Sequence, residues 1–256
     1  MDEIHYLLGN SCNLNCDFCF WEKKFPPATL KLAKHIIDEI KKTGIKKITV
    51  SGGEPTYTDH FLEIIKYAKK NNLEIILHTN GLLINKKIAK KMAPLISRIS
   101  LAIDGSNEKM AIEMRKKPFT KHTLFLIDLF NSLKVPVNIK TLVTEVNKED
   151  IENIGNLLQN KPIKYWSLLE FNPLGKGLIN KNKYFLLSKD FKKIAEKVIN
   201  QFPKIKIKTR KFMSKKEKYC FIAADGKVYT NSEEKDVLIG DLKTNSLSSI
   251  IKSNGF

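Results

Sequence analysis

Apolar and polar residues follow two different periods along this chain, which predict strands and helices in turn. Short runs rich in β-branched residues, such as KKITV at 46–50 and LEIILH at 73–78, predict strands that are mostly buried. In LKLAKHIIDEI, which starts at residue 30, the apolar positions recur at helical spacing. The expected strands are 3–8, 46–50, 73–78, 96–103, 135–143 and 165–171. The expected helices are 30–42, 60–71, 85–92, 120–132, 148–159 and 189–200.

The strict alternation of six strands with helices indicates the fold class. It is typical of an α/β protein with a parallel sheet and helical crossovers, either open or partly closed into a barrel. A chain of 256 residues can bury a sizeable core as one domain. Ligands of such sheets bind beyond the carboxyl ends of the strands, so the loops that follow the strands are the expected active site.

The pattern changes after residue 203. KIKIKT at 204–209 predicts a strand, and two apolar runs around Asp225-Gly226 predict a hairpin. The run VLIGDL and a short helix at 247–251 follow. We therefore expect a core at 1–203 and a small C-terminal α+β cap at 204–256 that belongs to the same fold.

The net charge of +18 raises the question of a nucleic-acid partner. Only three of the 45 basic residues are arginines, namely Arg98, Arg115 and Arg210. Arginine is the preferred residue for bidentate phosphate and base contacts, and the lysines are spread over predicted helix faces and loops. We therefore interpret most of the charge as solvated surface and do not favour nucleic acid. The second interpretation is attraction of an anionic substrate such as a nucleotide, RNA or an acidic peptide.

The sequence also predicts the compartment. The most apolar short run, 124–130, is interrupted by Asp128, so no segment is expected to span a membrane. The N-terminus MDEIHYLL is acidic and indicates a strand rather than a signal peptide. Four cysteines do not make a disulfide framework in a chain of this length. We expect a soluble, cytoplasmic protein.

Three of the four cysteines lie in CNLNCDFC at 12–19, directly after the first expected strand. The spacing C-x3-C-x2-C of Cys12, Cys16 and Cys19 lets one loop wrap around a single metal centre, and thiolates are the usual ligands of zinc and of iron–sulfur clusters. Zinc requires four ligands, and the sequence offers no obvious fourth. Three thiolates would hold three irons of a [4Fe–4S] cluster and leave one iron open. The alternatives are a structural zinc loop or chance clustering.

The loop after the second strand adds a further motif. SGGEP at 51–55 places two glycines at a strand end, where they allow a ligand to approach the backbone closely. Together with C-x3-C-x-aromatic-C, in which Phe18 is the aromatic residue, this motif resembles the radical S-adenosylmethionine (radical SAM) enzymes. The resemblance covers roughly the first 200 residues.

The resemblance implies one [4Fe–4S] cluster and SAM as cofactors. Cys12, Cys16 and Cys19 would ligate the cluster, and its open iron would bind the amino and carboxylate groups of SAM. Two groups of residues would bind SAM, one around the SAM amino group and one further along the chain. The first group is Gly52, Gly53 and Glu54, with Pro55 shaping the loop, and Phe18 would lie near the adenine.

The second group of implied SAM contacts follows the third and fourth strands. Asn80, in HTNG, would make a polar contact to SAM or substrate, although a turn that leads into a helix is an equal interpretation. Asp104, in LAIDG, would contact SAM or substrate, and Arg115 would pair with the SAM carboxylate. Ala102 stands where the family pattern has a serine, so this part of the pattern is incomplete.

The resemblance also implies the chemistry. A reduced cluster passes an electron to the sulfonium of SAM, and the resulting 5′-deoxyadenosyl radical abstracts a hydrogen atom from the substrate. The electron donor would be a protein such as ferredoxin or flavodoxin. We identify no acid–base pair, so the catalytic side chains stay unknown. PLGKG at 173–177 could approach SAM or an anionic substrate, but an ordinary loop is the favoured interpretation.

The fourth cysteine, Cys220, precedes Asp225-Gly226. This resembles the SPASM or twitch extensions of peptide-modifying family members, which bind auxiliary clusters, but Asn231 stands where the next cysteine would be. One thiol cannot hold a cluster of that kind. The favoured interpretation of Cys220 is a buried core residue, and the second is a thiol that faces the active site as a hydrogen-atom donor.

The sequence thus predicts a single-cluster radical SAM enzyme on a partial (β/α)6 barrel with a metal-free cap. Its unidentified substrate would be a peptide or protein, a nucleotide or another small molecule. The runner-up is a viperin-like nucleotide dehydratase, since Phe20 completes C-x3-C-x-F-C-F, although the core expected in the fifth strand reads NIKTLVT here. A further alternative is a catalytically silent family member that binds a partner.

Overall fold

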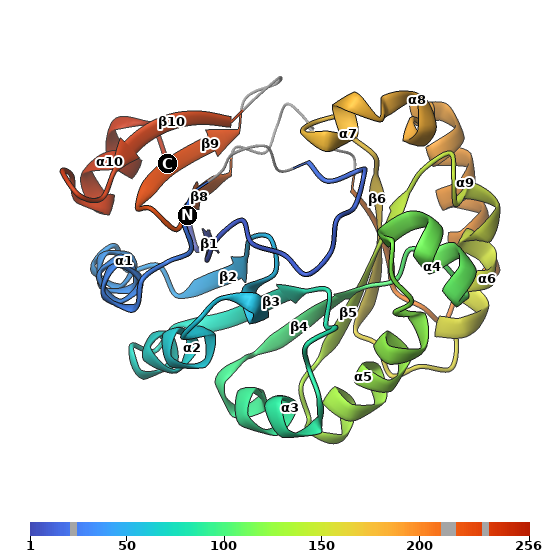
Figure 1. Ribbon diagram of the computed structural model, residues 1–256, viewed down its shortest axis with the longest axis horizontal. Helices are drawn as coiled ribbons and strands as arrows, with labels where there is room; N and C mark the ends of the chain where they lie inside the picture. Colours follow the sequence, from blue (N-terminus) through green and yellow to red (C-terminus); the bar gives the residue numbers. More distant parts are fainter. Residues whose placement is uncertain (21–24, 211–218, 232–235) are drawn as a thin grey trace.

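The computed structural model describes residues 1–20, 25–210, 219–231 and 236–256. Within these residues, ten strands form one sheet, and helices cover one side of it (Figure 1). The strands are β1 Glu3–Leu7, β2 Lys47–Ser51, β3 Glu74–Thr79, β4 Arg98–Ala102, β5 Val137–Val143, β6 Tyr165–Glu170, β7 Ile207–Arg210, β8 Cys220–Ile222, β9 Lys227–Asn231 and β10 Asp236–Asp241. The helices are α1 Leu30–Lys42, α2 Phe61–Lys70, α3 Lys86–Met92, α4 Glu108–Arg115, α5 Thr120–Ser132, α6 Ile151–Leu158, α7 Lys176–Ile179, α8 Lys181–Tyr184, α9 Ser188–Gln201 and α10 Leu247–Ser253, with 3₁₀ turns η1 Pro55–Tyr57, η2 Ala93–Leu95 and η3 Lys148–Asp150.

The sheet follows the chain order from β1 to β7, and all six pairings between these strands are parallel. The full order is β10-β9-β8-β1-β2-β3-β4-β5-β6-β7. Since β10 and β7 are its two edges among the described residues, the sheet curves without closing (Figure 1). The expected α/β fold with a partial barrel of parallel strands is confirmed.

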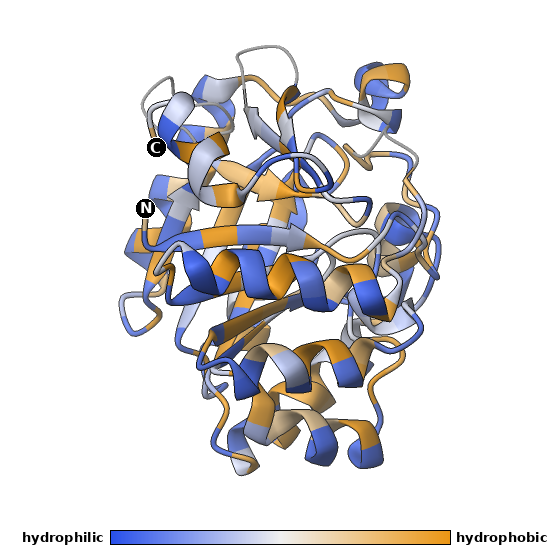
Figure 2. Cartoon of the chain, turned by 90° about the vertical axis from the view of Figure 1, so that its left-hand side faces the viewer, coloured by the Kyte–Doolittle hydropathy of each residue, from blue (hydrophilic) through white to orange (hydrophobic). Residues whose placement is uncertain are grey.

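The helices form where apolar residues recur on one side of each turn. In α1 the side chain of Thr29 accepts a hydrogen bond from the amide of Leu32, which caps the helix, and Ile36, Ile37 and Ile40 are buried against the sheet. Burying one such side chain contributes about 1.5–3 kcal/mol. Figure 2 shows the resulting alternation of hydrophobic and hydrophilic turns on this side of the molecule. No helix in the described parts of the chain combines the length and apolar character needed to cross a membrane.

Helix α4 was not expected from the sequence. Its signal is Asn107, whose side chain accepts a hydrogen bond from the amide of Met110 and caps the first turn. The side chain of Asn147, which directly precedes η3, does not cap this turn and instead bonds to other loops. The Asn147 amide group donates to the carbonyls of Asp104 and Leu142.

The C-terminal segment continues the same sheet. Strand β8 pairs in parallel with β1, and β9 returns antiparallel to β8 after the tight turn at Gly226, whose φ is 91°. The expected hairpin around Asp225-Gly226 is confirmed. Helix α10 packs beside α1, where the buried carboxylate of Glu39 accepts a hydrogen bond from the amide of Leu247. The division into a core at 1–203 and a cap at 204–256 stays a prediction.

Gly155 provides a test of the packing between α6 and the end of α9. A Cβ atom added at Gly155 would lie 2.2 Å from Cε2 of Phe202. Alanine at a helical glycine normally stabilises by about 1 kcal/mol, but overpacking of a core costs about 1–3 kcal/mol. We therefore expect Gly155→Ala to lower the free energy of unfolding in urea by about 1 kcal/mol. The exposed neighbour Asn156→Ala is the control and should change it by less than about 0.5 kcal/mol; an equal or greater stability of Gly155→Ala would contradict this packing.

Candidate functional site

The cysteine loop crosses the open side of the sheet, from the end of β1 toward α7 (Figure 1). Cys16 is buried, Cys19 is half-buried and Cys12 is exposed, and all three are free thiols. Within the described residues, no three cysteine, histidine or acidic side chains already lie in a metal-binding arrangement. The chemistry of the donor set is still informative, because three soft donors on one loop fit a cluster with one open iron better than a four-ligand zinc site.

The SGGEP loop after β2 holds the first part of the cysteine loop. The amide of Gly53 donates to the carbonyl of Gly9 at 2.8 Å, and the amide of Glu54 donates to the carbonyl of Ser11 at 2.9 Å. A Cβ atom added at Gly53 would lie 2.4 Å from the carbonyl oxygens of Asn10 and Ser11. A side chain at Gly53 would therefore push the two loops apart.

The buried side chain of Glu54 ties this loop to the next one. Its carboxylate accepts hydrogen bonds from the hydroxyl of Thr79 at 2.6 Å and from the amide of Asn80 at 2.7 Å. It also accepts from the amide and hydroxyl of Thr56, at the start of η1, which Pro55 begins. Glu54 thus joins the carboxyl ends of β2 and β3.

Asn80 in turn contacts the cysteine loop. Its amide group donates to the side chain of Asn13 at 2.8 Å and lies 3.8 Å from Sγ of Cys12. Its oxygen accepts from the amide of Leu82, which is the turn geometry given as the alternative for this segment. The structure thus brings Asn80 to the cysteines, and its contact to SAM stays a prediction.

The segment after β6, which includes helix α7, holds the other end of the cysteine loop. The amide of Gly177 donates to the carbonyl of Cys19 at 3.2 Å, and Asn180 donates to the carbonyl of Asp17 at 3.1 Å. Gly175 has a φ of 60°, and a Cβ atom there would lie 2.6 Å from the carbonyl of Phe20. The glycines of PLGKG therefore serve close approach to the cysteine loop, which their spacing alone did not reveal.

Phe18 and Arg115 lie together beside the buried Cys16. The ring of Phe18 packs edge-on against Tyr184, with centroids 5.6 Å apart, and the Arg115 guanidinium lies 5.2 Å from the Phe18 centroid. Arg115 also forms an ion pair with the fully buried Asp104. Asp104 accepts a second bond from the amide of Leu142 at 2.7 Å. The structure thus places both Asp104 and Arg115 at the site but pairs them with each other, and their expected contacts to SAM stay predictions.

The pKa values of the thiols depend on their burial and on the positive charge of Arg115. Burial would lower the pKa of Arg115, but Asp104 and the thiols of Cys16 and Cys12 outweigh it and raise the pKa. Burial raises the pKa of Cys16 to about 11, although Arg115 opposes this shift. Burial likewise raises the pKa of Cys12. The Arg115 side chain therefore provides positive charge that favours thiolates here.

Cys220 lies on the other face of the sheet. Phe221 pairs with His5, and Ile222 pairs with Tyr6. Since side chains alternate along a strand, Cys220 shares a face with Ile222 and Tyr6, inside the main core. Burial raises the pKa of the Cys220 thiol to about 12. The interpretation as a core residue fits this position, and the interpretation as a thiol facing the active site does not.

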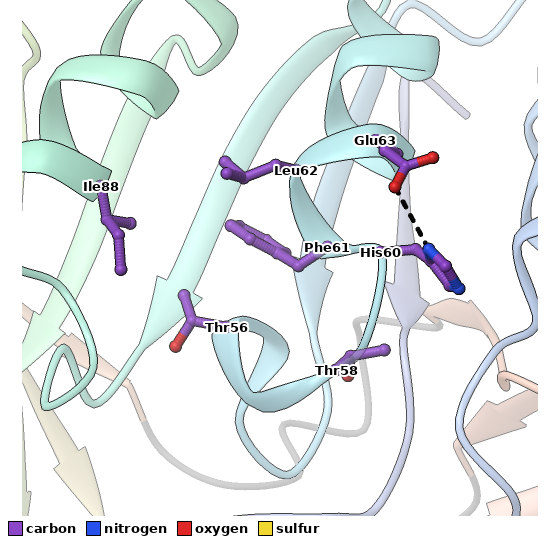
Figure 3. Close-up of a pocket in the computed structure, with 7 residues that line it drawn as sticks. All are labelled: Thr56, Thr58, His60, Phe61, Leu62, Glu63 and Ile88. Carbon is purple, nitrogen blue, oxygen red and sulfur yellow. Dashed lines mark hydrogen bonds and ion pairs between the residues drawn. The ribbon is translucent and has the colours of Figure 1, made fainter.

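A cavity of about 320 Å³ lies near the SGGEP loop, between η1, α2 and α3. Figure 3 shows its lining, which includes Thr56, Phe61 and Ile88 and the pair formed by His60 and Glu63. No cysteine lines this cavity.

Comparison with known proteins identifies the family. Residues 6–158 match the model of the radical SAM superfamily, which is more than half of the chain. The chain belongs to the radical SAM superfamily, as the cysteine and SGGEP motifs indicated.

The similar proteins have names that describe different activities. The chain is 32% identical over 180 residues to the AdoMet-dependent heme synthase of Methanosarcina barkeri, covering 68% of this chain and 52% of that protein. It is 28% identical over 185 residues to an S-adenosylmethionine-dependent nucleotide dehydratase of Lacinutrix mariniflava, covering 67% of this chain and 38% of that protein. The chain thus spans about half or less of the length of these two relatives.

The fold is shared with SuiB of Streptococcus suis, solved with S-adenosylmethionine and with its precursor peptide SuiA. The SAM-bound structure superposes with a TM-score of 0.78 at 16% identity, covering 97% of this chain and 65% of SuiB. The peptide-bound structure gives a TM-score of 0.77 at 16% identity, covering 97% and 64%. At this identity the likeness shows the fold.

The four hydrogen bonds to Glu54 supply a test of the site's internal support. Glu54→Gln replaces an acceptor oxygen with an amide group that faces hydrogen-bond donors. Because hydrogen bonds to a charged group contribute about 1.5–3 kcal/mol, we expect a loss of at least about 1.5 kcal/mol in the free energy of unfolding, measured in urea. Glu63→Gln on α2 makes the same chemical change at an exposed carboxylate, and its expected effect is below about 0.5 kcal/mol. Equal effects of the two variants would show that Glu54 does not hold the loops.

Proposed function

We propose that this chain is a single-cluster radical SAM enzyme that abstracts a hydrogen atom from a peptide or protein substrate. The observation that carries the proposal is the cysteine loop itself. Three thiols lie on one loop that is fixed at both ends, by SGGEP on one side and by the loop after β6 on the other. Such a loop supplies three ligands and leaves one iron of a [4Fe–4S] cluster for SAM.

In this proposal Cys12, Cys16 and Cys19 hold the cluster, which when bound supplies the electron that cleaves SAM. The chain's own residues position and protect the cofactors. The loop that contains Gly52 and Gly53 would bind the SAM amino group, and Asn80 and the pair formed by Asp104 and Arg115 stand beside the thiols as polar contacts. The packed side chains of Phe18 and Tyr184 exclude water from Cys16.

A peptide substrate is supported by the fold and by the C-terminal strands. The likeness to SuiB covers 97% of this chain, and SuiB was solved with a precursor peptide. The hairpin β8–β9 extends the sheet beside β1, and β1 is the strand that leads into the cysteine loop. The electron donor in this proposal is a small redox protein such as ferredoxin or flavodoxin.

Nucleotide dehydration is the second candidate. It is supported by the 28% identity to the nucleotide dehydratase and by Phe20, which follows Cys19 as in viperin-like enzymes. Two observations count against it. The sequence of β5 differs from the core expected in viperin-like enzymes, and the chain covers only 38% of the length of that relative. Incubation of the reduced enzyme with SAM and either nucleoside triphosphates or peptides distinguishes the two, because only the true substrate raises 5′-deoxyadenosine release.

Cysteine variants test the cluster assignment. After anaerobic reconstitution, we expect about four irons per chain and release of 5′-deoxyadenosine from SAM upon reduction. Cys16→Ala should abolish both, because two thiolates do not hold the cluster. Cys220→Ala is the matched control and should keep both, since this thiol lies in the core on the other face of the sheet. Iron binding and 5′-deoxyadenosine release that survive in Cys16→Ala would overturn the assignment.

A further inference from the structure

A layer of polar side chains lies on the concave face of the sheet, one step below the cysteine loop. The rings of His5 on β1 and His78 on β3 have centroids 6.3 Å apart, although β2 lies between their strands. The ammonium of Lys140 on β5 lies 3.1 Å from Nδ1 of His78, although β4 lies between these strands. These three side chains therefore meet across the curvature of the sheet. We refer to Lys140, His78 and His5 as the basic floor. Arg98 lies on the same face of β4, two residues before Ser100, which pairs with His78.

Positive charge from neighbouring arginines acts on this layer. Burial, the positive charge of Arg210 and, to a smaller extent, that of Arg98 together lower the pKa of Lys140 to about 7, although Glu3 opposes the shift. Glu3 is the one carboxylate among the charged groups that act on Lys140 in the described part of the chain, and it also accepts a hydrogen bond from Thr49. Burial lowers the pKa of His78 well below its usual value. The positive charges of Arg210 and Arg98 thus act on Lys140 more strongly than the negative charge of Glu3 does.

Two buried polar atoms beside the floor have no partner in the described structure. They are Oδ1 of Asn138, a fully buried residue, and Nε of Arg98. Asn138 pairs in register with Ser100 on β4, which pairs with His78 on β3, so Asn138 belongs to the same layer. Buried polar atoms in native proteins are nearly always satisfied. An unsatisfied donor and acceptor beside excess positive charge indicate a polar ligand.

The floor faces the place where the reaction would occur. His78 precedes Asn80 by two residues, and Asn80 contacts the cysteine loop. Lys140 precedes Leu142 by two residues, and the amide of Leu142 binds Asp104. Because side chains two residues apart share one face of a strand and lie about 7 Å apart along it, the floor lies one layer below the cysteine site.

We propose that the basic floor binds an anionic group of the substrate, a phosphate or a carboxylate, and directs the rest of the substrate toward the cysteine loop. The anion would contact Lys140 and Arg98 and would offset the burial of their charge. The direction toward the loop rests on the proposed function, whereas the binding of the anion does not. The same anionic group occurs in acidic peptides and in nucleotides.

Calorimetric titration of the oxidised, cluster-loaded protein without SAM tests the binding directly. Sulfate represents a phosphate group and acetate a carboxylate, at constant ionic strength. We expect one of the two to bind with one site per chain, and the preferred one identifies the group. Lys140→Met should weaken binding at least tenfold, because it keeps the length of the side chain and removes its charge. Lys90→Met, at an exposed position on α3, makes the same change elsewhere and should bind as wild type does.

Two further measurements complete the test. Lys140→Arg should retain binding within about threefold, because it keeps the positive charge. Binding to the wild type should weaken several-fold from pH 6.5 to 8.5, because Lys140 loses its proton while sulfate and acetate keep their charge. If Lys140→Met does not fold, as judged by thermal melting, Arg98→Met is the second loss of charge and should weaken binding likewise.

The possible outcomes separate the two proposals. Absence of saturable binding of either anion, or equal binding by wild type and Lys140→Met, overturns the anion site. Binding that depends on Lys140 in a protein that releases no 5′-deoxyadenosine supports the anion site and contradicts the proposed function. Release of 5′-deoxyadenosine without anion binding leaves the enzyme assignment intact and rejects the floor.

Discussion

The close approach of two backbones, at Gly53 and Gly9, is the constraint on which the site depends. The hydrogen bond between them is 2.8 Å long, and no side chain fits at Gly53. It fixes the start of the cysteine loop to the end of β2, and helix α7 fixes the other end through Gly177. The ends of β2 and β6, which are not neighbours in the sheet, therefore determine together where the three thiols lie.

The two faces of the sheet have separate tasks because side chains alternate along each strand. Ile4, Tyr6 and Cys220 contribute to the apolar core under the helices. His5, His78 and Lys140 lie on the concave face, where burial of polar groups costs free energy unless a partner is present. Stability thus comes mainly from one face, and the polar contacts that a substrate needs lie on the other.

Local pattern was sufficient to predict most of the framework. Apolar periodicity predicted the helices at α1 and α5 with their observed bounds, and the spacing of the cysteines and of SGGEP indicated the family. What the sequence did not reveal depends on contacts between distant residues. The role of Gly175 becomes clear only when Phe20 lies beside it, and Arg115 pairs with Asp104 across a loop. The basic floor depends on curvature, which brings β1, β3 and β5 together and leaves no trace in the local sequence.

The central claim is that three thiols leave one iron open and that SAM occupies it. Electron paramagnetic resonance of the reduced, reconstituted protein measures this most directly, because a ligand bound to an iron changes the electronic environment of the cluster. The account predicts a [4Fe–4S] signal that shifts when SAM is added, and that the shift is absent with adenosine, which lacks the amino and carboxylate groups. A cluster signal that SAM leaves unchanged at saturating concentration would contradict it.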